Sequence, residues 1–253
     1  MFRLSSTEKP LLILKRLGDP PYGLSLSELS ECIGIGKSGT YKVLQTMKEH
    51  HFVVQDDFTK KYYLGPPLLR LGNVYSKCAG IEDIIKPVLV KLSRQIGATA
   101  YVSVWEGDRV FGAYLDAPPG GVYSSNDFIG KSIAVNAGAS AMLLCAYQDP
   151  VYVEKNFDAF TIEKRTPGTL TDKAEVLAEF ARIRERGHVI EDETFNPGEV
   201  SVAVPLFDKN KRVLASLACA GYKKDVDEGT IENWLHLLKR EANEILSDFQ
   251  FRH

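Results

Sequence analysis

The sequence predicts a two-domain α+β protein, and three observations lead to this prediction. The chain of 253 residues exceeds the ~150 residues of an ordinary domain. Helical patterns and then a short hairpin fill residues 1–65, and strand and helix patterns alternate from residue 81 onward. The composition, 44% hydrophobic and 25% charged, is that of a globular protein, which excludes disordered and fibrous classes.

Apolar runs along the chain are short. No stretch reaches the ~18 apolar residues of a membrane span, because residues 134–147 are interrupted at Asn136, Gly138 and Ser140. The apolar run 11–14 is shorter than the ~7 residues of a signal-peptide core. We therefore expect a cytoplasmic protein without a membrane partner.

The two parts of the chain differ in net charge. Residues 1–80 hold 11 Lys and Arg against 7 Asp and Glu, which is +4, and residues 81–253 hold the remaining 20 against 26, which is −6. A basic N-terminal part suggests that an anionic polymer contacts this part alone.

Cysteine and histidine form no pattern that predicts a metal site or a disulfide framework. The four cysteines contain no C-x-x-C pair, so we expect buried reduced thiols at Cys32, Cys78, Cys145 and Cys219. The five histidines lack the spacings of zinc-binding helices, and glycine-rich phosphate loops are absent from the sequence. We expect no metal and no cofactor.

Residues 8–51 predict three helices, the last two joined by a tight turn. Helical spacing of leucines covers residues 8–17, which end at Gly18 and two prolines. Ser25 and Glu28 form a candidate capping box for the second helix, and Gly34 ends it. Residues 37–51 follow as the third helix, so a helix-turn-helix is expected.

A polar segment, residues 56–61, separates two β-rich runs and predicts a hairpin, which completes a winged helix-turn-helix domain over residues 1–65. The second helix of such a unit fits a DNA major groove, and its first N–H groups can hold a phosphate. The candidate DNA-binding residues are Lys37, Ser38, Thr40, Tyr41, Lys42 and Gln45 on the helix, with Lys60 and Lys61 at the wing tip. The alternative is a winged helix that contacts proteins, with these lysines as a solvated face and Tyr41 in the core.

A connecting helix is expected over residues 66–80, ahead of a larger domain at 81–253. The connecting helix is too apolar to remain in water, so we expect it and the winged domains to pair across a two-fold axis. In the larger domain the predicted helices are 81–96, 136–147, 172–186 and 227–251, and the predicted strands are 99–105, 109–116, 200–207 and 213–220.

Small side chains alternate along the last two predicted strands. Ser201 and Ala203 share one face of their strand, and Ser216, Ala218 and Ala220 share one face of the next. If these faces align, they leave volume for a small molecule, whose carboxylate would meet the N–H groups of a helix start at Asn136, Ala137, Gly138, Ala139 and Ser140. The alternative is close packing of a helix on the sheet.

A hydrolase is the competing prediction for this domain, because Ser201, His188 and Asp192 supply a nominal nucleophile, base and orienting acid. No G-x-S-x-G turn surrounds any serine in the sequence, however. We therefore expect that the protein is not an enzyme.

These motifs together resemble the isocitrate lyase regulator (IclR) family of bacterial transcription regulators. The matching stretches follow the family order along nearly the whole chain and lie at residues 23–29, 35–44, 62–66, 130–137, 182–193 and 196–198. The resemblance implies a GAF-like effector-binding domain, operator DNA and a small organic acid as partners, and self-association as a dimer of dimers. We expect a palindromic operator, because one winged unit covers only a half-site.

By this resemblance, the effector site falls on Ala139, Ser140, Glu191, Ser201, Ala218 and Ala220. This chain departs from the family at several positions, with alanines at 218 and 220 in place of hydroxyl residues, Ser201 for a frequent Cys, Asn136 for His and Met142 for Lys. We therefore expect a larger and more apolar acid than glyoxylate or pyruvate. Ser201 would donate to it, Ala218 and Ala220 would lie under its apolar part, and Glu191 would face a hydroxyl or stay at the rim. Aromatic walls are expected from Tyr101, Trp105, Tyr114 and Tyr123.

Overall fold

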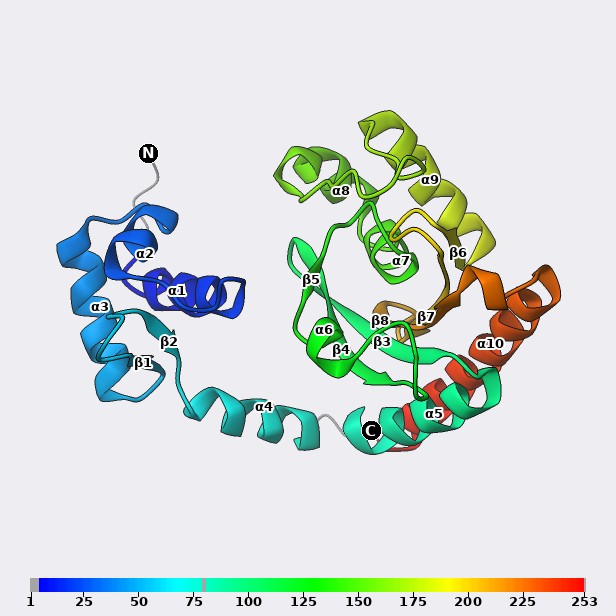
Figure 1. Ribbon diagram of the computed structural model, residues 1–253, viewed down its shortest axis with the longest axis horizontal. Helices are drawn as coiled ribbons and strands as arrows, with labels where there is room; N and C mark the ends of the chain where they lie inside the picture. The colour runs from blue at the N-terminus through cyan, green and yellow to red at the C-terminus, as the bar shows by residue number, and fades with distance from the viewer. Residues whose placement is uncertain (1–4, 79–80, 253) are drawn as a thin grey trace. The chain divides into compact units, whose positions relative to one another are not determined.

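The computed structural model describes residues 5–78 and 81–252 (Figure 1). Two compact units make up the chain, Met1–Ile81 and Glu82–His253. The last two residues of the expected connecting helix, 79 and 80, lie outside the described residues. The α+β fold class is confirmed, with a helical first unit and a second unit built on a six-stranded sheet.

The first unit is a winged helix-turn-helix followed by the connecting helix. Its elements are α1 (Glu8–Gly18), α2 (Leu26–Cys32), α3 (Lys37–Glu49), β1 (Val53–Gln55), β2 (Tyr62–Leu64) and α4 (Pro67–Cys78). The two short strands pair antiparallel, with Val54 opposite Tyr63. The core of this unit contains side chains from α1, α2, α3 and the hairpin, among them Ile13, Leu29, Leu44, Val53 and Tyr62.

Local sequence sets the helix-turn-helix geometry. The Ser25 hydroxyl accepts a hydrogen bond from the backbone N–H of Glu28, whose carboxylate accepts one from the backbone N–H of Ser25 at 2.7 Å. Gly34 then takes a positive φ of 64°, which favours glycine. The chain turns there, and the N–H of Ile35 donates to the Ser30 carbonyl at 3.1 Å. The predicted capping box and turn are both present.

The second unit is an antiparallel sheet with helices on both faces. The strand order is β5-β4-β3-β8-β7-β6. The strands are β3 (Thr99–Glu106), β4 (Arg109–Asp116), β5 (Ser132–Ile133), β6 (Val189–Asp192), β7 (Glu199–Phe207) and β8 (Val213–Tyr222). The helices are α5 (Ile81–Ile96), α6 (Ser125–Phe128), α7 (Ala139–Ala146), α8 (Pro150–Asn156), α9 (Lys173–Arg186) and α10 (Glu228–Arg252), with short 3₁₀ turns at Phe157–Ala159 and Lys223–Asp225.

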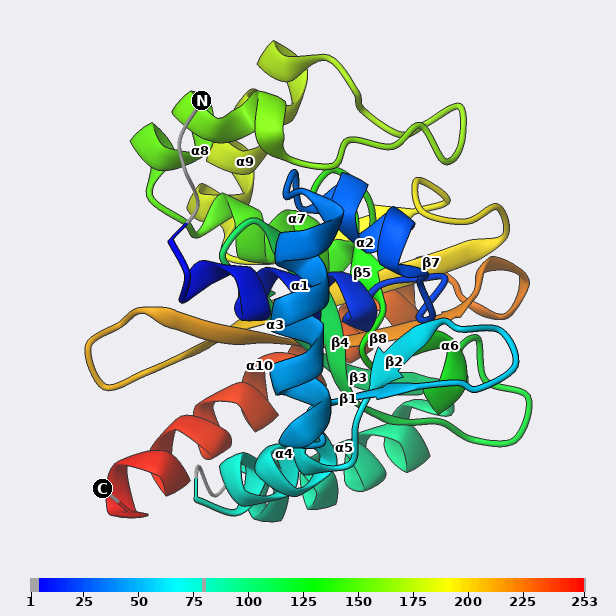
Figure 2. The ribbon, with the colours of Figure 1, turned by 90° about the vertical axis from the view of Figure 1, so that its left-hand side faces the viewer.

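The two faces of this sheet are covered differently. Helix α7 packs against β7, β8 and β3, with α8 and α9 on the same side (Figure 1). On the opposite face, a Cβ at Gly221 would lie 2.7 Å from the Trp234 ring, which places α10 there. Helix α5 lies alongside α10, where Lys91 pairs with the buried Glu241 carboxylate at 2.8 Å, and Figure 2 shows both helices from a second direction. The cavity described below lies on the α7 face.

The two faces of small side chains predicted for β7 and β8 do align. Ser201 lies opposite Ala220, and Ala203 lies opposite Ala218. All eight residues of α7 are buried, and Ala218 and Ala220 have no exposed surface. Both alanines belong to the core cluster that contains Ala139 of α7, and neither lines the cavity described below, against the expectation that they form its floor.

The short elements were not all predicted. Residues 125–128, 132–133 and 150–156 were not assigned to any element. Elements of two to seven residues show too little periodicity for a pattern to appear. Helix α8 did carry a local signal, since Asp149 caps it by accepting from the N–H of Tyr152 and Pro150 is its first residue. Helix α7 begins at Ala139, three residues later than predicted, because residues 136–138 form a turn.

Among the described residues, no helix is both long and apolar enough to cross a membrane. The longest helix is α10, with 25 residues, and it carries many charged side chains.

We predict that Ser25→Ala lowers the free energy of unfolding of the N-terminal unit by about 1 kcal/mol, because it removes the hydroxyl that caps α2. Ser27→Ala, at an exposed position of the same helix, is the control and should not lower stability. Urea denaturation followed by circular dichroism measures both variants. Equal midpoints for the two would contradict a stabilising cap.

Candidate functional site

The outer surface of α3 is polar and basic. Lys37, Ser38, Tyr41 and Lys42 are exposed, and Gln45 is half-buried. Tyr41 is 49% exposed, so this ring is outside the core. The first turn of α3 holds no acidic residue. The partial positive charge of its free N–H groups is therefore not neutralised, and it adds to the positive charge of the lysines. This surface is suited to a polyanion.

Thr40 does not belong to that surface, and the prediction that it contacts DNA is wrong. The residue is fully buried, and its hydroxyl donates to the carbonyl of Gly36 at 3.3 Å. Its position is one helical turn from Leu44, which also faces the core. Thr40 therefore stabilises the helix-turn-helix from within.

The wing connects β1 to β2 through residues 56–61. Lys60 is exposed and Lys61 is half-buried, with Lys61 near the carboxylate of Glu28. Phe58 lies in the turn between the two strands and is 96% exposed. Phe58 was not among the predicted DNA contacts, although a phenylalanine among the charged residues of a hairpin turn is a visible signal in the sequence.

A cavity of about 300 Å³ opens on the α7 face of the second unit. Its wall is made by the start of α7, by β3 and β7, by residues 123–133, and by two loops that contribute Arg165 and Phe195. Of the predicted effector residues, it includes Tyr101, Tyr123, Gly138, Ala139, Ser140 and Ser201. The structure therefore brings together residues separated by about a hundred positions in the sequence.

The start of α7 faces this cavity. Gly138 precedes the helix with a φ of 80°, and the first helical bond runs from the N–H of Met142 to the Gly138 carbonyl at 3.2 Å. The N–H groups of Ala139, Ser140 and Ala141 therefore precede the helical ladder. Among the described residues, the buried Ser140 hydroxyl makes no hydrogen bond of normal geometry, and the Tyr101 hydroxyl lies near it. Four donors thus lie at the cavity wall, which is an arrangement that binds a carboxylate.

Ser201 and Glu191 form a buried pair. The Ser201 hydroxyl donates to one carboxylate oxygen of Glu191 at 2.8 Å. The other oxygen accepts from the Thr194 hydroxyl at 2.9 Å and from the N–H of Phe195 at 2.8 Å. Glu191 is only 3% exposed, so the expectation that it lies at the rim is wrong. The expected role of Ser201 also changes, because its proton is engaged by Glu191 and its oxygen remains as an acceptor.

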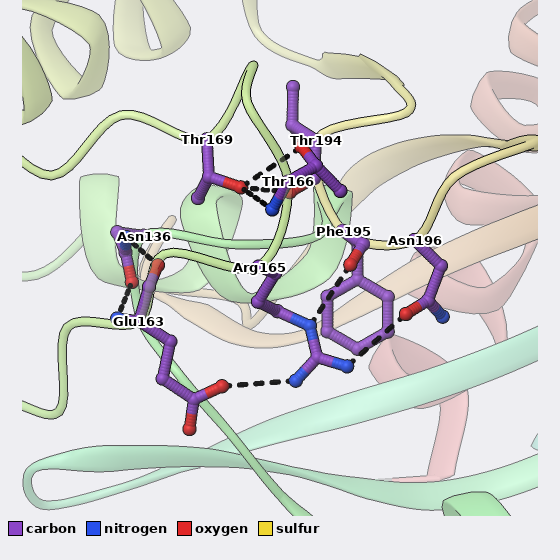
Figure 3. A network of polar contacts seen from close by, with 8 residues as sticks. All are labelled: Asn136, Glu163, Arg165, Thr166, Thr169, Thr194, Phe195 and Asn196. Carbon is purple, nitrogen blue, oxygen red and sulfur yellow. Dashed lines mark hydrogen bonds and ion pairs between the residues drawn. The ribbon is translucent and has the colours of Figure 1, made fainter.

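Asn136 holds a loop in place. Its side-chain amide donates to the Glu163 carbonyl at 2.8 Å, and its oxygen accepts from the N–H of Glu163 at 3.0 Å (Figure 3). The same amide also donates to the Leu170 carbonyl at 2.7 Å. Asn136 and Ala137 are buried behind the cavity wall. The prediction that these two residues contact an effector is therefore wrong, and Asn136 instead shapes the loop that carries Arg165.

Arg165 is a cation of the cavity wall that was not predicted from the sequence. Its guanidinium lies 4.1 Å from the centre of the Phe195 ring and donates to the Phe195 carbonyl at 3.0 Å (Figure 3). The same group pairs with Glu163 at 3.0 Å and with the Asn196 side chain at 3.2 Å. Nothing in the local sequence marks it, because the 163–170 loop reaches the cavity only through tertiary contacts. Lys131 also lines the cavity.

Aromatic rings make the apolar wall. Tyr123 stacks on Phe128 at 5.7 Å and meets Tyr101 edge to face at 5.8 Å. Burial raises the pKa of both tyrosines, so they stay protonated and can donate hydrogen bonds. Tyr123 donates to Glu199 at 3.1 Å. Tyr114 lies opposite Val102 on β3 and therefore faces away from Tyr101. Trp105 packs against Phe160. The prediction that Tyr114 and Trp105 form walls of the cavity is therefore wrong.

The three residues of the hydrolase alternative do not assemble. Ser201 faces Glu191, the His188 ring bonds the Arg186 carbonyl at 2.9 Å, and Asp192 pairs with Lys223 at 2.8 Å.

Residues 5–78 and 81–252 contain no group of His, Cys, Asp or Glu that could hold a metal ion, within the side chains described. Cys145 and Cys219 are buried, but Cys32 is exposed, against expectation.

The comparisons with known proteins agree with this architecture. Residues 74–247 match the family of the bacterial transcriptional regulator IclR C-terminal domain, and residues 6–57 match the IclR helix-turn-helix domain. The HTH-type transcriptional regulator XynR of Escherichia coli is 26% identical over 238 residues, which is 94% of each chain.

Two solved structures have the same fold. The IclR transcriptional regulator of Alicyclobacillus acidocaldarius superposes with a TM-score of 0.80 at 24% identity, covering 97% of this chain and 99% of that one. The IclR homologue of Microbacterium hydrocarbonoxydans complexed with 4-hydroxybenzoate has a TM-score of 0.76 at 18% identity, covering 97% and 99%.

A winged helix-turn-helix joined to a domain with an internal ligand cavity defines a ligand-responsive DNA-binding regulator. The chain belongs to the IclR family of bacterial transcriptional regulators. Members bind DNA through the helix-turn-helix domain and effectors through the C-terminal domain, and they are not enzymes.

We predict that Asn136→Ala destabilises the second unit by about 2 kcal/mol and opens the 163–170 loop, because three hydrogen bonds of a buried amide are lost. Limited trypsin digestion reads out the loop directly, since Lys164 and Arg165 lie in it. The variant should be cleaved there faster than the wild type. Asn156→Ala, which removes one surface hydrogen bond, is the control. Wild-type cleavage of Asn136→Ala would mean that Asn136 does not hold the loop.

Proposed function

We propose that two copies of this protein bind a palindromic operator, each placing α3 in the major groove of one half-site. The observation that carries this proposal is the exposed basic face of α3 at its N-terminal end. Lys37 and Lys42 contact phosphates, and Ser38, Tyr41 and Gln45 face base edges. Lys60 and Lys61 reach the backbone from the wing. The half-sites are about one helical turn or a multiple apart, and the protein acts in the cytoplasm, where bacterial DNA lies.

The connecting helix supports the proposed dimer. Leu69 and Tyr75 of α4 are 72% and 69% exposed, and Leu71 and Val74 are more than 40% exposed. An apolar surface of this kind is stabilised by pairing with a second copy. Association of two dimers through the effector domains is part of the same proposal and rests on the family resemblance.

The effector that fits the cavity is a small carboxylic acid with an aromatic or otherwise apolar body. Its carboxylate accepts from the N–H groups at the start of α7 and from the Ser140 hydroxyl, with Arg165 as the counter-charge. The apolar body lies against Tyr101, Tyr123 and Phe128. Ser201 accepts a hydrogen bond from a hydroxyl of the ligand. A relative of the same fold complexed with 4-hydroxybenzoate supports this choice of chemistry.

Effector binding changes DNA binding only if the ligand has different affinities for two arrangements of the dimer. The connecting helix, expected over residues 66–80, is the covalent route between the two domains. We therefore assign to it the coupling between the cavity and the spacing of the two α3 helices.

We predict that Lys37→Ala/Lys42→Ala lowers operator affinity at least about tenfold and reduces the log–log salt slope by about two units, one per phosphate contact. Fluorescence anisotropy with a duplex selected from random sequence by the wild type measures both quantities and the stoichiometry of two chains per duplex. Lys209→Ala/Lys211→Ala removes the same charge from an exposed loop of the second unit and is the matched control. An unchanged slope for the α3 variant would reject α3 as the DNA-binding element.

We predict that Arg165→Gln weakens binding of aromatic carboxylic acids at least about tenfold, because a charge-assisted contact to the carboxylate is lost. Isothermal calorimetry with benzoate, 4-hydroxybenzoate and phenylacetate measures this effect. Arg182→Gln is the control, since Arg182 pairs with Glu179 on the surface of α9. Operator affinity without acid should stay at the wild-type value in both variants. Equal acid binding by wild type and Arg165→Gln would place the carboxylate elsewhere.

A further inference from the structure

Phe58 at the tip of the wing is exposed to an extent that folding does not explain. Its side chain is 96% exposed, and Val151, at 73%, is the next most exposed large apolar side chain in the described part of the chain. Removing a phenylalanine side chain from water is favourable. A side chain of this kind, held away from the core, gains that free energy only from a partner.

The turn that carries Phe58 is held firmly. One carboxylate oxygen of Asp56 accepts from the N–H groups of Phe58 and Thr59, at 3.1 and 2.6 Å, and from the Thr59 hydroxyl at 2.7 Å. The N–H of Asp56 donates to the Lys61 carbonyl at 2.9 Å, and the N–H of Lys60 donates to the Asp56 carbonyl at 3.0 Å. Phe58 is therefore presented on an ordered turn, which lowers the entropic cost of inserting it into a partner.

The same turn is connected to α3. The Lys48 ammonium of α3 donates to the side-chain oxygen of Gln55 at 2.9 Å, and the Gln55 amide donates to the Lys60 carbonyl at 3.0 Å. The N–H of Phe52 also donates to the Met47 carbonyl at 2.9 Å. When α3 occupies a major groove, these contacts set where the wing tip meets the neighbouring stretch of DNA.

The chemistry of the tip favours DNA over a protein partner. A phenylalanine supplies ~150–250 Å² of contact area, so a protein partner would have to find most of the ~1,000 Å² of a specific interface on the polar residues around it. Lys60 is exposed next to it and supplies a phosphate contact. Of the two acidic residues in the turn, Asp57 is exposed, whereas the Asp56 carboxylate is half-buried and turned toward the backbone N–H groups of the turn.

We propose that Phe58 enters the minor groove beside the half-site read by α3 and wedges between two base pairs, unstacking them and bending the operator. This inference rests on the proposed DNA-binding function. Apolar wedges of this kind bend DNA by ~20–90°, and unstacking the base pairs costs free energy. The cost is lowest at flexible pyrimidine–purine steps. The wing therefore adds sequence preference at positions where no hydrogen bond reads a base.

Three variants test the wedge with the full-length protein and the selected operator duplex. Phe58→Ala removes the ring, Phe58→Leu keeps an apolar wedge, and Lys60→Ala removes the neighbouring charge. End-to-end fluorescence energy transfer measures the bend, and 2-aminopurine placed at successive positions beside the half-site reports unstacking. Because Phe58 is almost fully exposed, none of the changes at this position should alter the melting temperature.

We expect Phe58→Ala to lose the bend and the 2-aminopurine signal, and to bind about tenfold more weakly with an unchanged salt slope, because no charge is removed. Phe58→Leu should keep most of the bend. Lys60→Ala should keep the bend and lose about one unit of salt slope. A wild-type bend and 2-aminopurine signal for Phe58→Ala would overturn the wedge, whether or not affinity changes. The proposed DNA-binding role of α3 would still stand in that case if Lys37→Ala/Lys42→Ala reduces the salt slope.

Discussion

Close contact between α7 and the sheet is the constraint on which the effector domain depends. The whole helix is buried, so only small residues such as Ala218 and Ala220 fit beneath it on β8. When a helix begins in the interior, neither water nor a preceding helical turn accepts hydrogen bonds from its first N–H groups. Gly138 permits this entry, because its φ of 80° is unfavourable for other residues and a Cβ there would crowd Phe195 at 3.3 Å. The polar character of the cavity follows from this packing.

Two buried polar side chains organise the loops around that helix. Asn136 fastens the 163–170 loop through backbone hydrogen bonds, and Glu191 holds the residues that carry Phe195. The Thr169 hydroxyl joins the two loops by donating to the Thr194 carbonyl at 2.5 Å (Figure 3). Buried polar groups need partners, and these side chains find them in the protein backbone. They position Arg165 and Ser201 at the cavity while taking no part in lining it.

The winged domain follows the same division between supporting and exposed residues. Thr40 closes the turn from inside, whereas Lys37 and Lys42 on the adjoining face remain in water. Lys48 also has a structural role, because it links α3 to the hairpin through Gln55. On a short helix, a shift of one or two residues therefore separates a residue that shapes the domain from one that is available to DNA.

The sequence by itself determined the order of the long elements, the capping box at Ser25, the winged hairpin and the presence of small residues on one face of β7 and of β8. These features depend on periodicity and on contacts between residues close in the chain, which a single sequence contains. The alignment of those two faces came from the strand register of the structure. The roles of Thr40, Asn136, Glu191, Ala218 and Tyr114 were decided only by the tertiary structure. Each depends on which face of an element turns inward and on which distant backbone group lies beside it. Arg165 belongs to the cavity for the same reason, since a loop without periodicity carries it there through contacts with residues about 30 positions away in the chain.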